Sequence, residues 1–499
     1  MNLTTHKKIL IGLIGWITLV FFSIFEYHSL FGKSCNFFES WLSCSTQPSL
    51  LSKELILFFV LVIFGSFIAG GWYLWKFYMS DNHINNNKSY LIIILFFLLS
   101  IFIVPFASRD ITFYFSSGKA LHSGLNTYAQ SWHISNYFVE AVQGSQDLVG
   151  FPYGPVMASV FKVVYSISGD NMVIFTIFWR LFIISLFILL SFLTYFLIRH
   201  YSKSHNKEIF YLFFLTQPLF LFEIVGSGHF DVFWIIFVLL AIIFAQYKKW
   251  WLVILSLIIG IWIKFVPVFM LPWFALWWWQ DISIDNWKKP LWQAVVGVFF
   301  SFLVTILVWS KYWSGFGVFD ILTRNNKWVT GSLFGVIYYG LEPIFKFFIG
   351  DNFHWLLTRF SHLLLFSILI YFVYPYIKNY ILIFLRKKKW RNIDFIQAIF
   401  VTMLSYLFLW QKSFWPWYVI WLIPVGLIVF AETKKVFVKK ILIWISLSPL
   451  SFYMVWIVNK FIVGSDAYGQ NWFNFFSFFV IMLYPLIQLY KWRKQNYDI

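Results

Sequence analysis

Charged residues are rare in this chain, and several of them stand beside long apolar runs. Asp110 follows the third of these runs directly, in Ser108-Arg109-Asp110. A carboxylate at the surface of a membrane can accept a proton from an incoming hydroxyl group, as a general base does. The same residue could instead cap a helix or pair with Arg109. The sequence therefore offers Asp110 as a candidate base, with a structural role as the alternative.

A second acidic position lies in Gly226-Ser-Gly-His229-Phe-Asp231, where another apolar run begins. The His and Asp could form a second acid site, or they could be only the polar start of a helix. The glycines beside them allow another group to approach the backbone closely. Asp231 is therefore a second catalytic candidate, and His229 is a candidate for binding substrate.

Lys264 lies inside the apolar segment Gly260-Ile-Trp-Ile-Lys-Phe-Val-Pro267. A lysine at the centre of a spanning helix costs roughly 2.5–3.5 kcal/mol on insertion scales, so we expect a compensating partner. A lipid phosphate would serve, and the alternative is that the side chain reaches the membrane surface. Lys412 is a second unexpected cation, within an aromatic segment that runs from Trp410 to Tyr418.

Aromatic residues dominate the segments between these charges. The stretch after Asp110 continues through Ile-Thr-Phe-Tyr114 to Gly124-Leu-Asn-Thr-Tyr128 and ends in Phe151-Pro-Tyr153-Gly-Pro155. Two prolines and a glycine fix a turn there, although such a turn could serve structure alone. Aromatic faces and hydrogen-bonding groups suit carbohydrate. The candidates for substrate binding are Tyr114, Tyr128, Tyr153, His229, Trp417 and Tyr418.

Membrane-spanning helices must position all of these residues. Of the 499 residues, 61% are hydrophobic and 12% are charged, whereas a soluble domain is nearer half apolar and a quarter charged. A spanning helix needs about 20 mostly apolar residues, and such runs fill the chain. We read 250–279, which carries Pro267 and Pro272, as two short helices that enter the membrane and return. The other expected spans are 9–27, 54–78, 90–107, 171–198, 208–225, 230–246, 290–310, 353–376, 394–410, 415–431, 440–459 and 472–490.

The sequence thus predicts an all-α polytopic membrane protein with about fourteen transmembrane or re-entrant helices. Lys and Arg collect on the cytoplasmic side of membranes, and their excess in alternate loops places both termini and the 378–393 loop in the cytoplasm. The segments 108–170 and 311–352 then form large external loops of a protein in the cell membrane. The formal net charge of +18 is mostly this topology signal, and no soluble basic domain that could bind nucleic acid is visible.

Cysteine and metal-binding signals are weak. The two cysteines, Cys35 and Cys44, lie in one expected external loop, where they could form a disulfide or remain free thiols. Two cysteines without a nearby histidine make a poor metal site. We therefore expect no metal site at the cysteines and no cofactor. A divalent metal stays open as an alternative, but no paired acidic motif supports one.

The motifs, taken in order, resemble those of C-type glycosyltransferases. Gly-Leu-Asn-Thr-Tyr128 and Tyr153-Gly-Pro are similar to the G-x-N-P-Y and Y-P-P segments of the polyprenyl-phosphate-mannose-dependent mannosyltransferases of family 87. Gly-His229-Phe-Asp and Ile-Lys264-Phe-Val-Pro resemble that family's G-H-N-D and T-K-x-x-P segments. Thr330-Gly-Ser-Leu-Phe-Gly resembles its N-x-S-L-x-G stretch, and the segment after Trp415 resembles its P-W-Y-x-x-W-x-x-P helix start. The related mannosyltransferases of GPI-anchor assembly share this layout.

The resemblance covers about 100–430 and implies a GT-C-like catalytic core over 90–430, flanked by transmembrane helices over 1–89 and 431–499. Asn126-Thr replaces the usual Asn-Pro and Gly154 replaces the first proline of Tyr-Pro-Pro. Two spans, rather than the usual one, precede the span that leads directly into Asp110. The sugar could therefore be mannose or another hexose.

The resemblance also implies a reaction. A sugar would move with inversion from a polyprenyl-phosphate donor to a lipid or glycan acceptor on the external face, with Asp110 as base. Lys264, Arg324 and Lys412 would bind the donor phosphate, where positive charge offsets the charge that develops on departure. Membrane lipids would surround the protein, and apolar grooves between spans would hold the prenyl chain.

Three other classes stay open: a transporter or flippase of a lipid-linked saccharide, a transferase with another lipid donor, and a structural subunit of an envelope complex. A transporter would need polar residues across the membrane interior, whereas polar residues here crowd one face.

Overall fold

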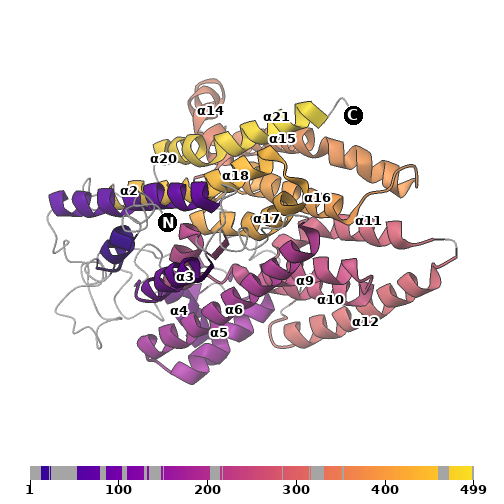
Figure 1. Ribbon diagram of the computed structural model, residues 1–499, viewed down its shortest axis with the longest axis horizontal. Helices are drawn as coiled ribbons and strands as arrows, with labels where there is room; N and C mark the ends of the chain where they lie inside the picture. The colour runs from indigo at the N-terminus through magenta and orange to yellow at the C-terminus, as the bar shows by residue number, and fades with distance from the viewer. Residues whose placement is uncertain are drawn as a thin grey trace.

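The computed structural model is almost entirely helical, and its longest helices run roughly along the long axis of the molecule (Figure 1). It describes residues 13–21, 23, 53–78, 86–103, 110–128, 132–133, 148–149, 151–202, 214–215, 217–283, 285–313, 315, 331–350, 353–458 and 471–496. The predictions for Cys35, Cys44 and Arg324 lie outside these residues.

The first half of the chain contains α2 (Lys53–Tyr78), α3 (Asn86–Ile101), α4 (Asp110–His122), α5 (Pro155–Ser168) and α6 (Met172–Tyr201). The expected external loop 108–170 is thus partly helical, because it contains α4 and α5. It also holds an antiparallel pair of two-residue strands, β1 (Trp132–His133) and β2 (Leu148–Val149), which the all-α prediction missed. A short helix, α8 (Pro218–Phe220), leads into a π-helix, η2 (Leu221–Gly226), and then into α9 (Val232–Gln246).

The second half begins with α10 (Trp250–Ile263), the 3₁₀-helix η3 (Val266–Met270), α11 (Leu271–Asp281) and α12 (Lys288–Trp309). It continues with α14 (Leu333–Ile349), α15 (Phe353–Phe384), α16 (Asn392–Ser405), η6 (Tyr406–Trp410), η7 (Pro416–Trp421) and α17 (Leu422–Thr433). The chain then forms α18 (Val436–Leu447), α19 (Leu450–Val458), α20 (Asn471–Ser477), η10 (Phe478–Met482) and α21 (Leu483–Asn496).

Seven helical segments of the described chain are long and apolar enough to cross a membrane, and four shorter helices are also apolar. The protein is therefore a multi-pass membrane protein. About fourteen crossings were expected, and the described residues contain half that number of full-length candidates. Within 208–225, the described residues are helical at 214–215 and continue through α8 into the π-helix η2, which ends at Gly226.

The prediction that 250–279 forms two short helices is confirmed, while its entry into the membrane stays a prediction. α10 and α11 are separate helices, and the chain leaves α10 at Lys264, whose extended backbone ends the helix. At the other end of the pair, Asp281 receives an ion pair from Lys248 and a 3.0 Å hydrogen bond from the Trp250 indole nitrogen. The start of α10 therefore lies beside the end of α11, and the turn that joins the two helices carries Lys264.

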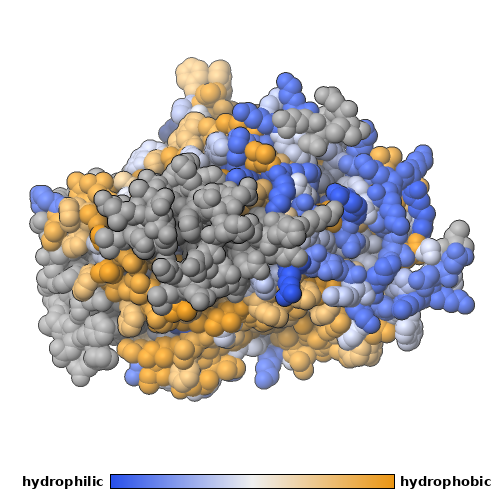
Figure 2. Space-filling view, viewed as in Figure 1, coloured by the Kyte–Doolittle hydropathy of each residue, from blue (hydrophilic) through white to orange (hydrophobic). Residues whose placement is uncertain are grey.

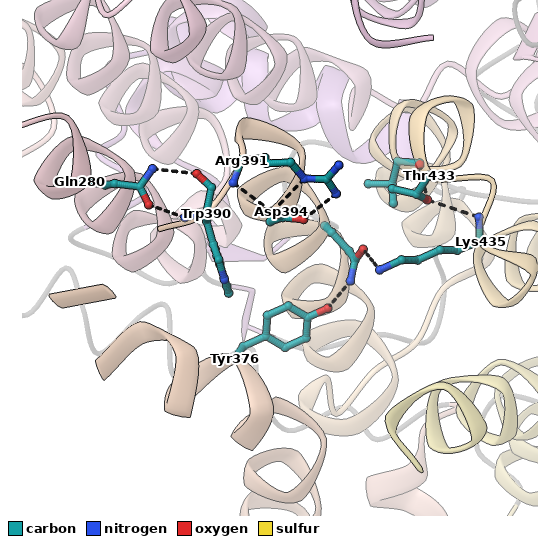
Figure 3. Close-up of polar contacts among 9 residues, drawn as sticks. Gln280, Tyr376, Trp390, Arg391, Asp394, Thr433 and Lys435 are labelled. Atoms are coloured by element: carbon teal, nitrogen blue, oxygen red, sulfur yellow. Dashed lines mark hydrogen bonds and ion pairs between the residues drawn. The ribbon is translucent and has the colours of Figure 1, made fainter. Parts of the chain in front are cut away.

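Polar contacts join several helices at the end of the molecule where α15 meets α16 (Figure 3). The Gln280 amide exchanges hydrogen bonds of 2.8 and 2.7 Å with the backbone of Trp390. Lys435 donates to Gln397, which in turn donates to the Tyr376 hydroxyl at 2.8 Å. The visible surface is hydrophilic at this end and largely hydrophobic along the lower edge (Figure 2). This end is therefore suited to water and the lower edge to lipid.

Candidate active site

Helix α4 begins with Asp110 and packs closely on α5. A Cβ atom added to Gly118 would lie 2.6 Å from the Phe161 carbonyl oxygen, so only glycine allows this approach. One turn after Asp110, the Tyr114 ring stacks on Phe161 with centroids 4.9 Å apart, and it also contacts Trp179 of α6. The start of α4 is therefore held by an aromatic layer that α5 and α6 contribute.

The segment between η2 and α9 carries the other two predicted acid-site residues, His229 and Asp231. Gly228 turns the chain with a φ of 75°, in the left-handed region that favours glycine. Its carbonyl oxygen accepts a 2.7 Å hydrogen bond from the Trp179 indole, and the next residue, Arg180, donates to the Val225 carbonyl oxygen at 2.8 Å. Two consecutive residues of α6 thus fix this segment opposite the start of α4.

The structure brings Asp110 and His229 together. Asp110 Oδ2 accepts a 3.1 Å hydrogen bond from the Tyr114 hydroxyl and lies 3.6 Å from His229 Nε2. The His229 side chain is fully buried, whereas 29% of the Asp110 side chain is exposed. Asp110 is therefore the member of the pair that a substrate can reach.

Sequence reasoning missed Glu223, which lies on the far side of His229. His229 Nδ1 is 3.1 Å from Glu223 Oε2, and the Glu223 side chain is fully buried. Burial lowers the pKa of His229, but the hydrogen bond and charge of Glu223, with the carboxylates of Asp110 and Asp231, outweigh it and raise that pKa. A glutamate inside the apolar run Leu221-Phe-Glu-Ile-Val was the signal that could have found it.

Asp231 and Lys264 form an ion pair, with 2.6 Å between Nζ and Oδ1. The same Asp231 oxygen accepts a 2.7 Å hydrogen bond from the Trp421 indole. The Lys264 ammonium also lies over the Tyr418 and Trp421 rings, 4.4 and 4.8 Å from their centroids. The expected partner of Lys264 is thus a protein carboxylate in this structure, and aromatic faces complete its surroundings.

The Tyr153-Gly-Pro turn lies directly against the end of α10. Gly154 donates a 3.1 Å hydrogen bond to the Ile263 carbonyl oxygen, and a Cβ atom on Gly154 would lie 2.0 Å from the Trp262 carbonyl oxygen. Proline at this position would lack the donor, which gives a physical reason for glycine in this chain. The turn brings the Tyr153 ring edge-on to Phe230, with centroids 4.7 Å apart.

Of three further candidates, Trp417 and Tyr128 contact residues of this site, whereas Lys412 lies against α14. Trp417 stacks on the His229 ring at 4.1 Å. Tyr128 is completely buried, and its hydroxyl donates a 2.7 Å hydrogen bond to the Tyr153 carbonyl oxygen, so it stabilises the Tyr153-Gly-Pro turn. Lys412 lies over the Phe334 ring, 5.1 Å from its centroid, and burial lowers the pKa of its ammonium group.

The described residues contain no group of three or more His, Cys, Asp or Glu side chains placed to hold a metal ion. What they bring together is a partly exposed carboxylate, a buried imidazole and an ion-paired lysine among aromatic rings. This set can accept a proton, bind an anion and contact a sugar face.

The chain matches the profile of a known protein family. The profile of the MptA/B family, described as alpha-(1→6)-mannopyranosyltransferase, N-terminal domain, matches residues 9–280, which is just over half of the chain. The matched region contains Asp110, Tyr153, His229, Asp231 and Lys264. No curated protein matches the chain.

Proposed function

Because the chain belongs to the alpha-(1→6)-mannopyranosyltransferase family, a family of polyprenyl-phosphate-mannose-dependent membrane enzymes, we propose that it moves mannose from a polyprenyl-phosphate donor to an acceptor hydroxyl at the cluster around Asp110. The observation that carries this proposal is the partly exposed Asp110 carboxylate, 3.6 Å from a buried histidine. Membership of a transferase family favours this reaction over transport of a lipid-linked saccharide.

The proposed step is a direct displacement. The Asp110 carboxylate takes the proton of the acceptor hydroxyl while the hydroxyl oxygen forms a bond to the anomeric carbon. The bond between that carbon and the phosphate oxygen breaks, and polyprenyl phosphate leaves with the bonding electrons. Such a step inverts the anomeric centre, so an alpha-linked product requires a beta-linked mannosyl phosphate as donor.

Lys264 is the residue that we propose to bind the donor phosphate. Its ammonium lies at the turn between two helices, and 13% of its side chain is exposed while Asp231 holds the other side. The phosphate gains negative charge as it leaves, so a fixed cation beside it stabilises the transition state more than the ground state. Lys412, on the segment between η6 and η7, and Arg324 are proposed as further cations for the same lipid headgroup.

Aromatic rings complete the proposed sugar site. Tyr153 and Tyr418 lie around the charged groups, where their rings could contact a sugar, and Trp417 packs against the His229 and Trp415 rings. Tyr114 fixes Asp110 through its hydroxyl. Tyr128 is assigned a supporting role beneath the Tyr153 turn.

We further propose that this site faces the outside of the cell membrane and that both termini are cytoplasmic. The polar end with the α15–α16 connection carries Arg386, Lys387, Lys388, Lys389 and Arg391, as cytoplasmic loops do.

A transfer assay tests the function. Radiolabelled polyprenyl-phosphate mannose is supplied to membranes with and without the protein, and the label is traced in lipids and glycans. We expect label in an alpha-(1→6)-linked product only where the protein is present. Label that crosses the membrane but stays on the polyprenyl phosphate would contradict the proposal and indicate transport.

A further inference from the structure

Glu223 is a buried carboxylate that the proposed reaction does not use. Its side chain has no exposed surface, and it lies on η2, behind His229 as seen from Asp110. Burying a charged carboxylate is costly unless a partner compensates it. The partner that the structure offers is His229, whose Nδ1 is 3.1 Å from both Glu223 Oε2 and the Glu223 backbone oxygen.

His229 connects Glu223 to Asp110 through its two nitrogens. Nδ1 faces the oxygens of Glu223, and Nε2 faces Asp110 Oδ2 at 3.6 Å. Both nitrogens therefore face oxygens that accept hydrogen bonds. A neutral imidazole has only one N–H group, whereas the imidazolium has two, so this geometry favours the charged form. The ring cannot easily turn away, because it is stacked on Trp417 at an interplanar angle of 14°.

The charges around His229 come from four elements. α4 contributes Asp110 and Tyr114, η2 contributes Glu223, the start of α9 contributes Asp231, and the end of α10 contributes Lys264, which is paired with Asp231. Glu223 and Asp110 are the carboxylates nearest the ring. The net effect of these groups is to raise the pKa of His229 despite its burial, with Glu223 as the strongest favourable influence.

We propose that Glu223 is a positioning residue that keeps His229 doubly protonated, so that a Glu223–His229–Asp110 chain orients the base. The inference rests on the proposed function and adds a residue to it. In this row of three side chains, the His229 imidazolium and the Tyr114 hydroxyl both contact Asp110 Oδ2. The carboxylate is thereby held in one orientation toward the acceptor hydroxyl.

The consequence is a pH dependence of transfer. A group with a raised pKa keeps its proton until the pH rises through that pKa, so activity falls on the alkaline side when His229 becomes neutral. Glu223→Gln removes the charge that raises the pKa of His229. We expect the alkaline limb of the pH–rate profile to move down by about one to three pH units, the usual effect of a close opposite charge.

Four variants of the full-length protein in membranes test this inference. Glu223→Asp keeps the charge and should keep the alkaline limb near its wild-type position. Glu342→Gln on α14 is the matched control, outside the proposed site, and should leave the profile unchanged. His229→Gln should abolish the alkaline limb, and the double variant Glu223→Gln/His229→Gln should be no slower than His229→Gln alone, because Glu223 acts only through His229.

Two results would overturn the inference. One is an alkaline limb that persists in His229→Gln, a result that does not depend on how well Glu223→Gln folds. The other is an unshifted limb in Glu223→Gln. Asp110→Asn distinguishes a failure of the proposed function from a failure of the role proposed for Glu223. If Asp110→Asn transfers normally, the proposed base fails, whereas an inactive Asp110→Asn with a wild-type pH profile in Glu223→Gln would remove only the role of Glu223.

Discussion

The buried Asp231–Lys264 ion pair gives the sharpest prediction of stability. The 2.6 Å separation is that of a strong charge-assisted hydrogen bond, and the side chains are only 2% and 13% exposed. Exposed ion pairs are worth about 0.2–1 kcal/mol, whereas removing one partner of a buried pair costs about 3–5 kcal/mol. Lys264→Met leaves the Asp231 carboxylate with the Trp421 indole as its remaining partner among these contacts. We therefore expect a cost near the lower end, about 3 kcal/mol.

A double-mutant cycle measures this coupling. Asp231→Asn, Lys264→Met and the double variant are purified in mixed micelles, and the free energy of unfolding is obtained by titration with SDS. The double variant should recover most of the loss because no unpaired charge remains, so the coupling energy should exceed about 2 kcal/mol. A coupling energy below about 0.5 kcal/mol, as for an exposed pair, would refute the reasoning.

Three other perturbations have defined outcomes. Gly154→Ala should destabilise the protein by about 1–3 kcal/mol and so lower its thermal unfolding temperature, because the added methyl group would overlap a backbone carbonyl on α10. An unchanged unfolding temperature would contradict the close packing. Hydrogen bonds from Lys119 and Tyr165 lower the pKa of Asp170 in the folded protein. The Asp170 carboxylate therefore stabilises the fold above its unfolded pKa of about 3.9, and this stabilisation is lost as the pH falls through the folded pKa. Asp170→Asn should slightly reduce the loss of stability at acid pH, and the change should be small because the Asp170 side chain is 71% exposed. Identical stability–pH profiles for Asp170→Asn and the wild type would contradict this prediction. In a protein whose Cys35 and Cys44 are replaced by serine, impermeant thiol reagents should label Ser123→Cys but not Lys388→Cys in intact cells, and labelling at 388 would reverse the proposed orientation.

The sequence was sufficient to predict a membrane protein and most of its long helices. α6, α12 and the paired helices α10 and α11 follow from apolar length and from prolines, which are local signals. The number of crossings could not be predicted in the same way. The run 208–225 is apolar enough to span, but its described part contains a π-helix that ends in the turn at Gly228. Contacts from Trp179 and Arg180 of another helix hold that segment, and no local pattern encodes them.

Four members of the candidate site were predictable from the sequence, whereas Glu223 and the pairing of the charged residues were not. Asp110, His229, Asp231 and Lys264 each stood out as polar residues beside apolar runs. Which carboxylate would face which cation depends on how α4, α9 and α10 pack, and that arrangement is a tertiary property. The ion pair between Asp231 and Lys264 and the placement of His229 beside Asp110 therefore required the structure.

The central claim is that Asp110 is the base for mannosyl transfer, and single-turnover kinetics of Asp110→Asn test it most directly. The amide keeps the size of the side chain but cannot take a proton, while general-base assistance is typically worth about 10²–10⁴-fold in rate. Asp170→Asn is the matched control because the same substitution falls outside the proposed site. We predict that Asp110→Asn inserts normally, binds radiolabelled polyprenyl-phosphate mannose like the wild type and transfers at least about a hundredfold more slowly. Transfer by Asp110→Asn within a few-fold of the control, at equal protein levels, would contradict the claim.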